Sequence, residues 1–231
     1  MFVAPFRSPF SSPFPSSGAA AAIPWYLSGN VAIANCVAAY QPKGAASLAA
    51  SYSNLANPGT YNAAPGVAPT FDASTGWTFN GSTQYLTTGI TTAPQHADWS
   101  MIVRFSNQSG SYQIALGSYA PATGARFEIW PEYGGIIAYY SYNYITKSPN
   151  LTSGVLAISG THGFRNGTNE ATIASGGDPS NKYPALFLGA GNNGSGSPEY
   201  KFNGKIQAAA IYNTILSDAQ VSAVTTAMNA L

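Results

Sequence analysis

Two carboxylates and a tryptophan stand at alternate positions in FEIWPEYGG, residues 127–135. If this segment is a strand, Glu128, Trp130 and Glu132 point to one face, because side chains alternate across a strand. Two carboxyl groups that face a sugar can cleave a glycosidic bond, one as the acid and one as the nucleophile or base. The segment is therefore the first candidate for a sugar-cleaving site.

The spacing of the two glutamates argues against that chemistry. A retaining glycosidase holds its carboxyl groups about 5–5.5 Å apart, and an inverting one about 6.5–9.5 Å apart. Four steps along a regular strand separate Glu128 from Glu132 by about 13 Å. Retaining β-glucanases also carry an aspartate where this sequence has Trp130. We therefore expect no catalytic residue and no enzymatic activity, and two solvated glutamates beside a packed tryptophan in a strand that Pro131 ends.

The composition indicates a folded domain with few charges. Only 7% of the 231 residues are charged, against roughly 25% in an ordinary soluble domain, whereas 45% are hydrophobic and 15 are tyrosines. Nine Lys and Arg residues and a net charge of +1 offer no basic strip for phosphates, so we expect no nucleic-acid partner. No apolar run is long enough to insert into a membrane, and the single Cys36 excludes an internal disulfide.

The first 24 residues differ in composition from the rest of the chain. The stretch APFRSPFSSPFPSS repeats Pro-Phe every fourth residue, and proline at this density excludes a helix or an interior strand. We interpret residues 1–24 as an extended arm and residues 25–231 as one folded domain. An arm of this kind becomes ordered when its phenylalanines enter pockets, either of a partner or of the chain's own body. We favour an assembly arm, whose partner-binding residues are Phe2, Phe6, Phe10 and Phe14.

Short β segments separated by turns follow from about residue 31. Asn-Gly pairs, as at 166–167 and 203–204, suit tight turns that need a positive φ. Candidate strands are 99–106, 112–117, 125–131, 136–145, 154–159, 171–174, 185–190 and 205–213. Because no helical periods intervene, we predict an all-β fold, an antiparallel jelly-roll β-sandwich.

One helix is expected at the C-terminus, at about 217–230. Ser217 can cap it, and Gln220 completes a capping box. A second helical stretch is expected at 44–55. The apolar side chains on one face of the C-terminal helix are Val221, Val224, Met228 and Leu231.

Four motifs occur in a characteristic order: FNGSTQYL at 79–86, WSMIVRF at 99–105, HGFRNGT at 162–168, and FNGKIQAAAIYNTILSDAQVSAV at 202–224. Together they resemble the laminin-G-like (concanavalin A-like) lectin–glucanase domains of tailed-bacteriophage virion proteins. The resemblance covers roughly residues 31–231 and implies the β-sandwich fold. It is a weaker guide to function, because this fold serves lectins, hydrolases and scaffolds alike.

The resemblance and the arm together favour a non-catalytic structural protein on the surface of a phage virion. Such a protein would be a capsid decoration or a head or tail appendage, such as a tail fibre. Its arm would bind other virion proteins, it would form a homo-oligomer, and it would contact host-surface glycans for adhesion. The alternative is a carbohydrate-binding adhesin or lectin module. A third reading, a glycan hydrolase, is weakened by the missing acid pair.

Laminin-G-like domains sometimes bind Ca²⁺ through loop aspartates, and Asp72 and Asp98 are the candidate ligands here. The sequence has no repeated Asp-x-Asp/Asn loop, so we expect no metal and no cofactor.

Tyrosines dominate IIAYYSYNYI at 136–145. Alternate tyrosines share one face of a strand and offer a rigid contact area with a polar tip, which suits recognition. Plain cross-strand packing is the alternative. The Gly/Asn/Ser loop at 189–200 can offer amides to sugar hydroxyls. The candidate glycan-binding residues are Tyr140, Tyr142, Tyr144, Trp130, Asn192 and Asn193.

Overall fold

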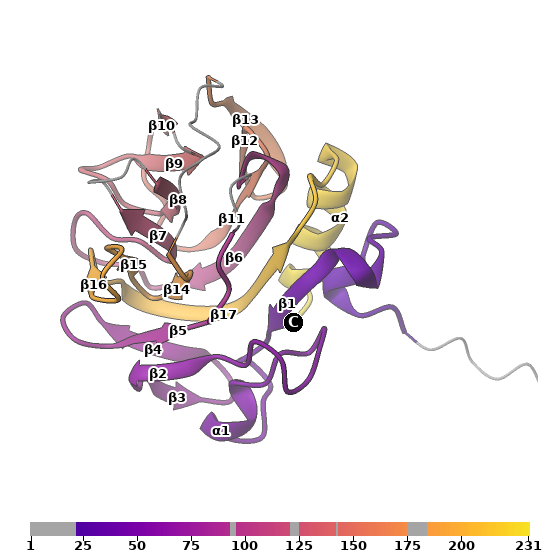
Figure 1. Cartoon of the computed structure of the whole chain (residues 1–231), viewed down its shortest axis with the longest axis vertical. Helices are drawn as coiled ribbons and strands as arrows, with labels where there is room; N and C mark the ends of the chain where they lie inside the picture. Colours follow the sequence, from indigo (N-terminus) through magenta and orange to yellow (C-terminus); the bar gives the residue numbers. More distant parts are fainter. Residues whose placement is uncertain (1–21, 93–95, 121–124, 142, 175–183) are drawn as a thin grey trace, which may run out of the picture.

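The computed structural model describes residues 22–92, 96–120, 125–141, 143–174 and 184–231 (Figure 1). The described chain folds into two facing β-sheets, with one short helix near the C-terminus. The antiparallel β-sandwich expected from the sequence is therefore confirmed. Four predicted contact residues lie outside the described residues, so the assembly arm stays a prediction. These residues are Phe2, Phe6, Phe10 and Phe14.

The first sheet is antiparallel throughout. Its strands, in spatial order, are β13 (Thr168–Thr172), β12 (His162–Arg165), β11 (Gly154–Ser159), β6 (Ser100–Ser106), β17 (Asn203–Tyr212), β4 (Gly76–Asn80) and β3 (Thr70–Asp72). Strand β1 (Cys36–Tyr40) also pairs with β17.

The second sheet carries the tyrosine-rich segments. Its strands, in spatial order, are β10 (Asn143–Lys147), β9 (Ile137–Ser141), β8 (Ala125–Trp130), β7 (Leu116–Ala120), β14 (Phe187–Leu188), β5 (Tyr85–Thr87) and β2 (Ala64–Val67). Two short strands lie beside this path: β15 (Gly191–Asn192) runs parallel to β7, and β16 (Pro198–Glu199) pairs with β15. Strand β8 ends at Trp130, as Pro131 predicts.

Alternation along β8 divides its side chains between two environments. Phe127 and Ile129 are fully buried in the core between the sheets. Burying a side chain of this size contributes about 1.5–3 kcal/mol. Trp130 belongs to a separate apolar cluster, so it lies with Glu128 on the other, outer face of the second sheet.

The outer face of the first sheet is covered by helix α2 (Asp218–Asn229), which lies against it in Figure 1. The helix begins at the predicted cap: Ser217 accepts from the Gln220 N–H, and the Gln220 side chain accepts from the Ser217 N–H. Its predicted apolar face packs on the sheet together with the 3₁₀ turn η1 (Trp25–Leu27). This face is therefore occupied by the chain itself.

Several expected strands are shifted or shortened in the structure, such as 112–117, which corresponds to β7, and 185–190, of which only β14 is a strand. Two further elements differ in kind. Residues 136–145, expected as one strand, form the hairpin of β9 and β10, in which Tyr140 pairs with Tyr144. Side chains alternate between the two faces along both strands of a hairpin, so this alternation does not reveal where the chain reverses. The helix expected at 44–55 is only the four-residue α1 (Leu48–Ser51). Asn54 ends it by holding the chain to β1, because its side chain bonds Ala39 N and Val37 O.

Two more 3₁₀ turns complete the described elements, η2 (Ile33–Asn35) and η3 (His96–Asp98). Among the described helices, none has the length and apolar character needed to cross a membrane.

Candidate functional site

The outer face of the second sheet carries an aromatic cluster built on Trp130. The Trp130 ring lies 4.7 Å from the Tyr200 ring and 5.0 Å from the Tyr133 ring, centroid to centroid. Tyr140 and Tyr119 lie 6.2 Å from it. These distances are those of ordinary favourable aromatic pairs. Of the two described α-helices, α2 packs on the first sheet and α1 bonds to Trp77 of β4, so neither covers this cluster.

A buried ion pair stands beside this cluster. Arg126 and Glu128 share the outer face of β8, and the guanidinium donates to both carboxylate oxygens at 2.9 Å. Trp130 Nε1 donates to the same carboxylate at 2.5 Å. The flat guanidinium lies between two rings, 3.6 Å from the centroid of Tyr140 and 4.6 Å from that of Tyr119. Bidentate pairing and cation–π contacts together hold Arg126 and both rings in place.

Burial dominates the electrostatics of the pair. The Glu128 side chain is fully buried, and this burial raises its pKa to about 7, although the hydrogen bonds and charge of Arg126 and the Trp130 bond lower it in part. Burial alone would lower the pKa of Arg126, but Glu128 raises it above its ordinary value. Burial also raises the pKa of Tyr119 to about 12 and raises that of Tyr140. Both tyrosine hydroxyls therefore stay protonated at neutral pH and can donate hydrogen bonds.

Three exposed tyrosines surround the buried centre. Tyr144 is 58% exposed and stacks on Tyr140 with centroids 4.8 Å apart and planes 15° from parallel. Tyr112 is 50% exposed and meets the edge of Tyr133 at 5.4 Å. Tyr200 is 37% exposed. Large apolar rings exposed together on a buried aromatic base are typical of a recognition surface. We call Tyr112, Tyr119, Tyr133, Tyr140, Tyr144, Tyr200, Trp130 and Arg126 the aromatic platform.

Two platform tyrosines are held in an uncommon backbone conformation. Tyr112 and Tyr200 have φ angles of 54° and 48°, in the left-handed region that side chains other than glycine rarely adopt. Such conformations persist only where neighbouring structure enforces them, and they cluster at functional sites. The two loops are tied together, since the Ile114 N–H donates to Tyr200 O at 2.9 Å.

A buried amide network holds these loops. Gln113 is 5% exposed, and its Nε2 donates to Ser109 O at 2.6 Å. Its Oε1 accepts from Gln108 Nε2 at 3.2 Å and from Asn203 N at 3.0 Å. Satisfied buried networks of this kind are rigid. Tyr112 and Tyr200 are therefore positioned before any ligand arrives.

The two glutamates of FEIWPEYGG do not face a common space. Glu132 follows the end of β8, and its carboxylate accepts from Gly135 N at 2.7 Å and from Asn150 Nδ2. It closes the turn after the strand, whereas Glu128 bonds to Arg126 and Trp130. The expectation of two solvated glutamates is wrong, because Glu128 is 0% and Glu132 3% exposed. Each carboxylate has found partners that offset its desolvation.

The predicted glycan-binding residues separate into three groups. Trp130, Tyr140 and Tyr144 are brought together in the aromatic platform. Tyr142 lies outside the described residues. Asn192 is buried, donates to Ala185 O and accepts from two glycine N–H groups of its own loop, while Asn193 Oδ1 accepts from Ser195 and Ser197. Both amides shape the loop, and their contact with a glycan stays a prediction.

The sequence reasoning missed five members of the platform. Arg126 carried a usable signal, because alternation along the expected strand 125–131 places it on the face of Glu128 and Trp130. Tyr119 lies beyond the strand expected at 112–117, although it is part of β7 in the structure. The loop residues carried none, since only the paired strands bring them to Trp130. The missed residues are Tyr112, Tyr119, Arg126, Tyr133 and Tyr200.

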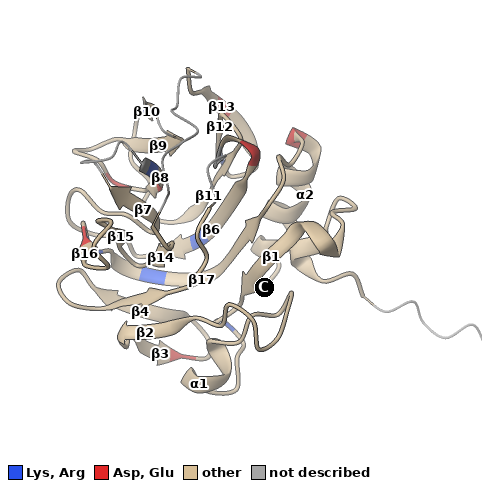
Figure 2. Ribbon diagram, viewed as in Figure 1, with Lys and Arg blue, Asp and Glu red and all other residues tan. Residues whose placement is uncertain are grey.

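The candidate Ca²⁺ ligands are not grouped. Asp72 Oδ1 accepts from Ser74 and Thr75 in the β3–β4 turn, and the Ser74 hydrogen bonds lower its pKa. Asp98 belongs to η3. Within the described ranges, no three His, Cys, Asp or Glu side chains gather as a metal site would require. Figure 2 shows the charged residues as isolated spots rather than as a strip of one sign.

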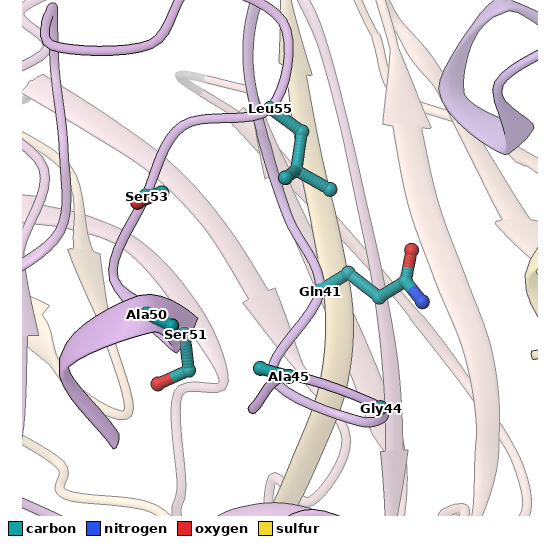
Figure 3. Close-up of a pocket in the computed structure, with 7 residues that line it drawn as sticks. All are labelled: Gln41, Gly44, Ala45, Ala50, Ser51, Ser53 and Leu55. Carbon is teal, nitrogen blue, oxygen red and sulfur yellow. The ribbon is translucent and has the colours of Figure 1, made fainter. Parts of the chain in front are cut away.

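A separate pocket of about 220 Å³ adjoins α1 (Figure 3). Two of its polar side chains are already engaged in hydrogen bonds: Gln41 Oε1 accepts from Trp25 Nε1 at 2.9 Å, and Ser51 Oγ accepts from Trp77 Nε1 at 2.7 Å. Figure 3 shows Gln41 and Ser51 pointing in different directions, so they do not converge on one ligand. The residues that line it are Gln41, Gly44, Ala45, Ala50, Ser51, Ser53 and Leu55.

Comparison with known proteins finds similarity only at the level of structure. No protein-family model and no curated protein matches the sequence. Domain 4 of AbnA matches with a TM-score of 0.55 at 15% identity, covering 83% of this chain and 98% of that domain. AbnA is a GH43 extracellular arabinanase from Geobacillus stearothermophilus, and the domain was solved in complex with arabinotriose. Trypanosoma rangeli sialidase in complex with sialic acid matches with a TM-score of 0.53 at 13% identity, covering 83% of this chain. This chain spans 33% of the sialidase.

These matches confirm the β-sandwich and correct one expectation. The claim that this chain is not an enzyme is overturned, because the matched structures belong to an arabinanase and a sialidase. At these identities the likeness shows the fold alone, and the fold occurs within enzymes.

Proposed function

We propose that the chain is a carbohydrate-binding β-sandwich domain and that the aromatic platform is its binding surface. The observation that carries this proposal is the arrangement of three exposed tyrosines around buried Trp130 on a sheet face that neither described α-helix covers. This role corresponds to the adhesin or lectin alternative weighed from the sequence.

The chemistry of the platform suits a sugar. A pyranose or furanose ring has an apolar C–H face that packs on an aromatic ring, and a rim of hydroxyls that needs donors and acceptors. Tyrosine supplies both in one side chain. The hydroxyls of Tyr119 and Tyr200 lie 3.4 Å apart and can hydrogen-bond to hydroxyls of the same sugar. The arabinanase domain, whose structure was solved with arabinotriose, supports a sugar as the ligand.

The rigidity of the surface adds to the proposal. Binding a flexible ligand costs ordering entropy on both sides, and a surface that is already ordered reduces the protein's share. The Gln113 network and the Arg126–Glu128 pair keep the loops and rings in place in the free protein.

Titration calorimetry on sugars chosen from a glycan array tests the proposal. Tyr144→Ala and Tyr200→Ala are each expected to weaken binding about 10-fold, because each removes an aromatic contact and its buried area. Tyr61→Ala is the matched control, because Tyr61 is 44% exposed and also has a positive φ, of 56°, but is not part of the platform. Equal effects of all three substitutions, or no sugar binding by the unchanged protein, would contradict the proposal.

A second proposal concerns residues 1–24, which attach the domain to a larger assembly. The repeated Pro-Phe pairs support it, since an extended chain with regularly spaced phenylalanines suits binding to a partner's pockets. The surface of a phage capsid or tail, with several copies of the chain side by side, is the setting we propose. The two roles are compatible, because the arm and the platform are different parts of the chain.

A further inference from the structure

We infer that the aromatic platform binds an extended, uncharged oligosaccharide that contacts Tyr144 and Tyr200 together, rather than a single sugar at one point. This inference rests on the proposed carbohydrate-binding function and names its ligand class.

The two tyrosines are the ends of one continuous series of ring and guanidinium contacts, which we call the stack although its last contact is edge-on. Tyr144 lies 4.8 Å from Tyr140, Tyr140 lies 3.6 Å from the Arg126 guanidinium, and the guanidinium lies 4.6 Å from Tyr119. Tyr119 then meets Tyr200 at 4.8 Å. Every member touches the next, so the distance between the two ends is set by packing and not by loop motion.

Exposure along this stack is greatest at its ends. Tyr144 is 58% and Tyr200 37% exposed, whereas Tyr140 is 2% exposed and the Arg126 side chain 19%. A ring of a sugar can therefore pack on the two ends but not on the face of Tyr140, which Tyr144 and Arg126 cover. A single sugar reaches one end. A chain of several sugars reaches both and passes over the middle of the stack.

The charges near the stack favour an uncharged chain. Arg126 is the cation of the platform, and its Nε and Nη2 donate to Glu128. The guanidinium also lies over the rings of Tyr119 and Tyr140. Glu199 and Lys201 flank Tyr200 with opposite charges, so that end carries no net charge to attract an acidic sugar. Figure 2 shows an acidic residue in red on β16.

Two contacts within one ligand strengthen each other. Once one end of the ligand is bound, its other end contacts the protein at a high effective concentration. The gain in affinity therefore exceeds the gain expected only from the larger number of sugar units in a longer chain. We expect the dissociation constant to fall on the order of 100-fold between a monosaccharide and a chain that spans both ends.

The test is a titration series at pH 8, where the Arg126–Glu128 pair is ionised. The probes are arabinose, arabinotriose and arabinohexaose, cello- and malto-oligosaccharides of the same lengths, and oligogalacturonides as the charged counterpart. Affinity is expected to rise steeply with length in an uncharged series. Tyr144→Ala and Tyr200→Ala are each expected to flatten that rise, while Tyr61→Ala leaves it unchanged.

The outcomes separate this inference from the function on which it rests. Equal affinity for the monosaccharide and the hexaose, a loss confined to one end, or preference for the oligogalacturonides would overturn the two-ended uncharged site alone. Absence of binding by every probe, on an array as well as in solution, would overturn the carbohydrate function and the inference together.

Discussion

Arg126 and Glu128, two residues apart on one strand, form a bidentate ion pair in which the carboxylate is fully buried and the guanidinium lies between two tyrosine rings. The aromatic rings on this sheet face are thus held in place by an ion pair that packs against them. The pair ties the position of Tyr119 and Tyr140 to that of Trp130. Its loss should therefore change both stability and ligand binding.

Replacing the arginine alone should be strongly destabilising. Arg126→Met leaves Glu128 buried without its cation, which costs about 3–5 kcal/mol of unfolding free energy when the carboxylate stays ionised. The double variant Arg126→Met, Glu128→Gln removes the unpaired charge and should regain much of that loss. Denaturant unfolding at pH 8 measures both. A single variant as stable as the unchanged protein would show that the pair does not support the platform.

The pKa of Glu128 predicts how stability varies with pH. The folded protein holds this proton up to about pH 7, whereas the unfolded chain releases it near the ordinary value of 4.5. Protonation of Glu128 therefore makes its whole contribution to the unfolding free energy below about pH 4.5. This contribution, about 3 kcal/mol, is lost as the pH rises from 4.5 to 7. Glu128→Gln should lack this fall. Unfolding curves between pH 4 and 8 that are parallel for the two proteins would contradict the raised pKa.

Asn192 and Asn193 should differ in what their removal changes. Asn192→Ala leaves the Ala185 carbonyl and two glycine N–H groups without their partner and should cost about 1–3 kcal/mol of stability. Asn193→Ala removes hydrogen bonds within an exposed turn and should cost less than about 1 kcal/mol. Thermal unfolding distinguishes the two. If Asn193→Ala abolishes sugar binding at unchanged stability, its amide is a ligand as well as a loop support.

Removal of residues 1–21 tests the arm. Pro24 must be retained, because its carbonyl accepts from the Leu27 N–H at the start of η1, whose Trp25 and Tyr26 pack under α2. The shortened chain is expected to keep its unfolding midpoint and its sugar affinity but to lose its higher-order assembly in analytical ultracentrifugation. An unchanged sedimentation profile would show that the arm does not mediate assembly.

Local rules predicted several parts of the fold from the residues alone. Ser217 and Gln220 marked the start of α2 because a capping box needs only two residues three positions apart. Alternation placed Glu128 and Trp130 on one face of their strand, and Pro131 marked the end of β8. These features depend on neighbours within a few residues, so the sequence contains all of their determinants.

The site itself depended on pairing over long distances. Tyr200 contacts Trp130 because β15 pairs with β7 and β16 pairs with β15. No short segment of the sequence encodes this placement. The expectation that Glu128 is solvated was also wrong, because the assembled sheet, and not the strand alone, decides whether its side chain is buried. The sequence by itself determined which residues could face outward. Only the tertiary structure decided which of them meet, because hydrogen-bonded registry between distant strands sets the distances between side chains.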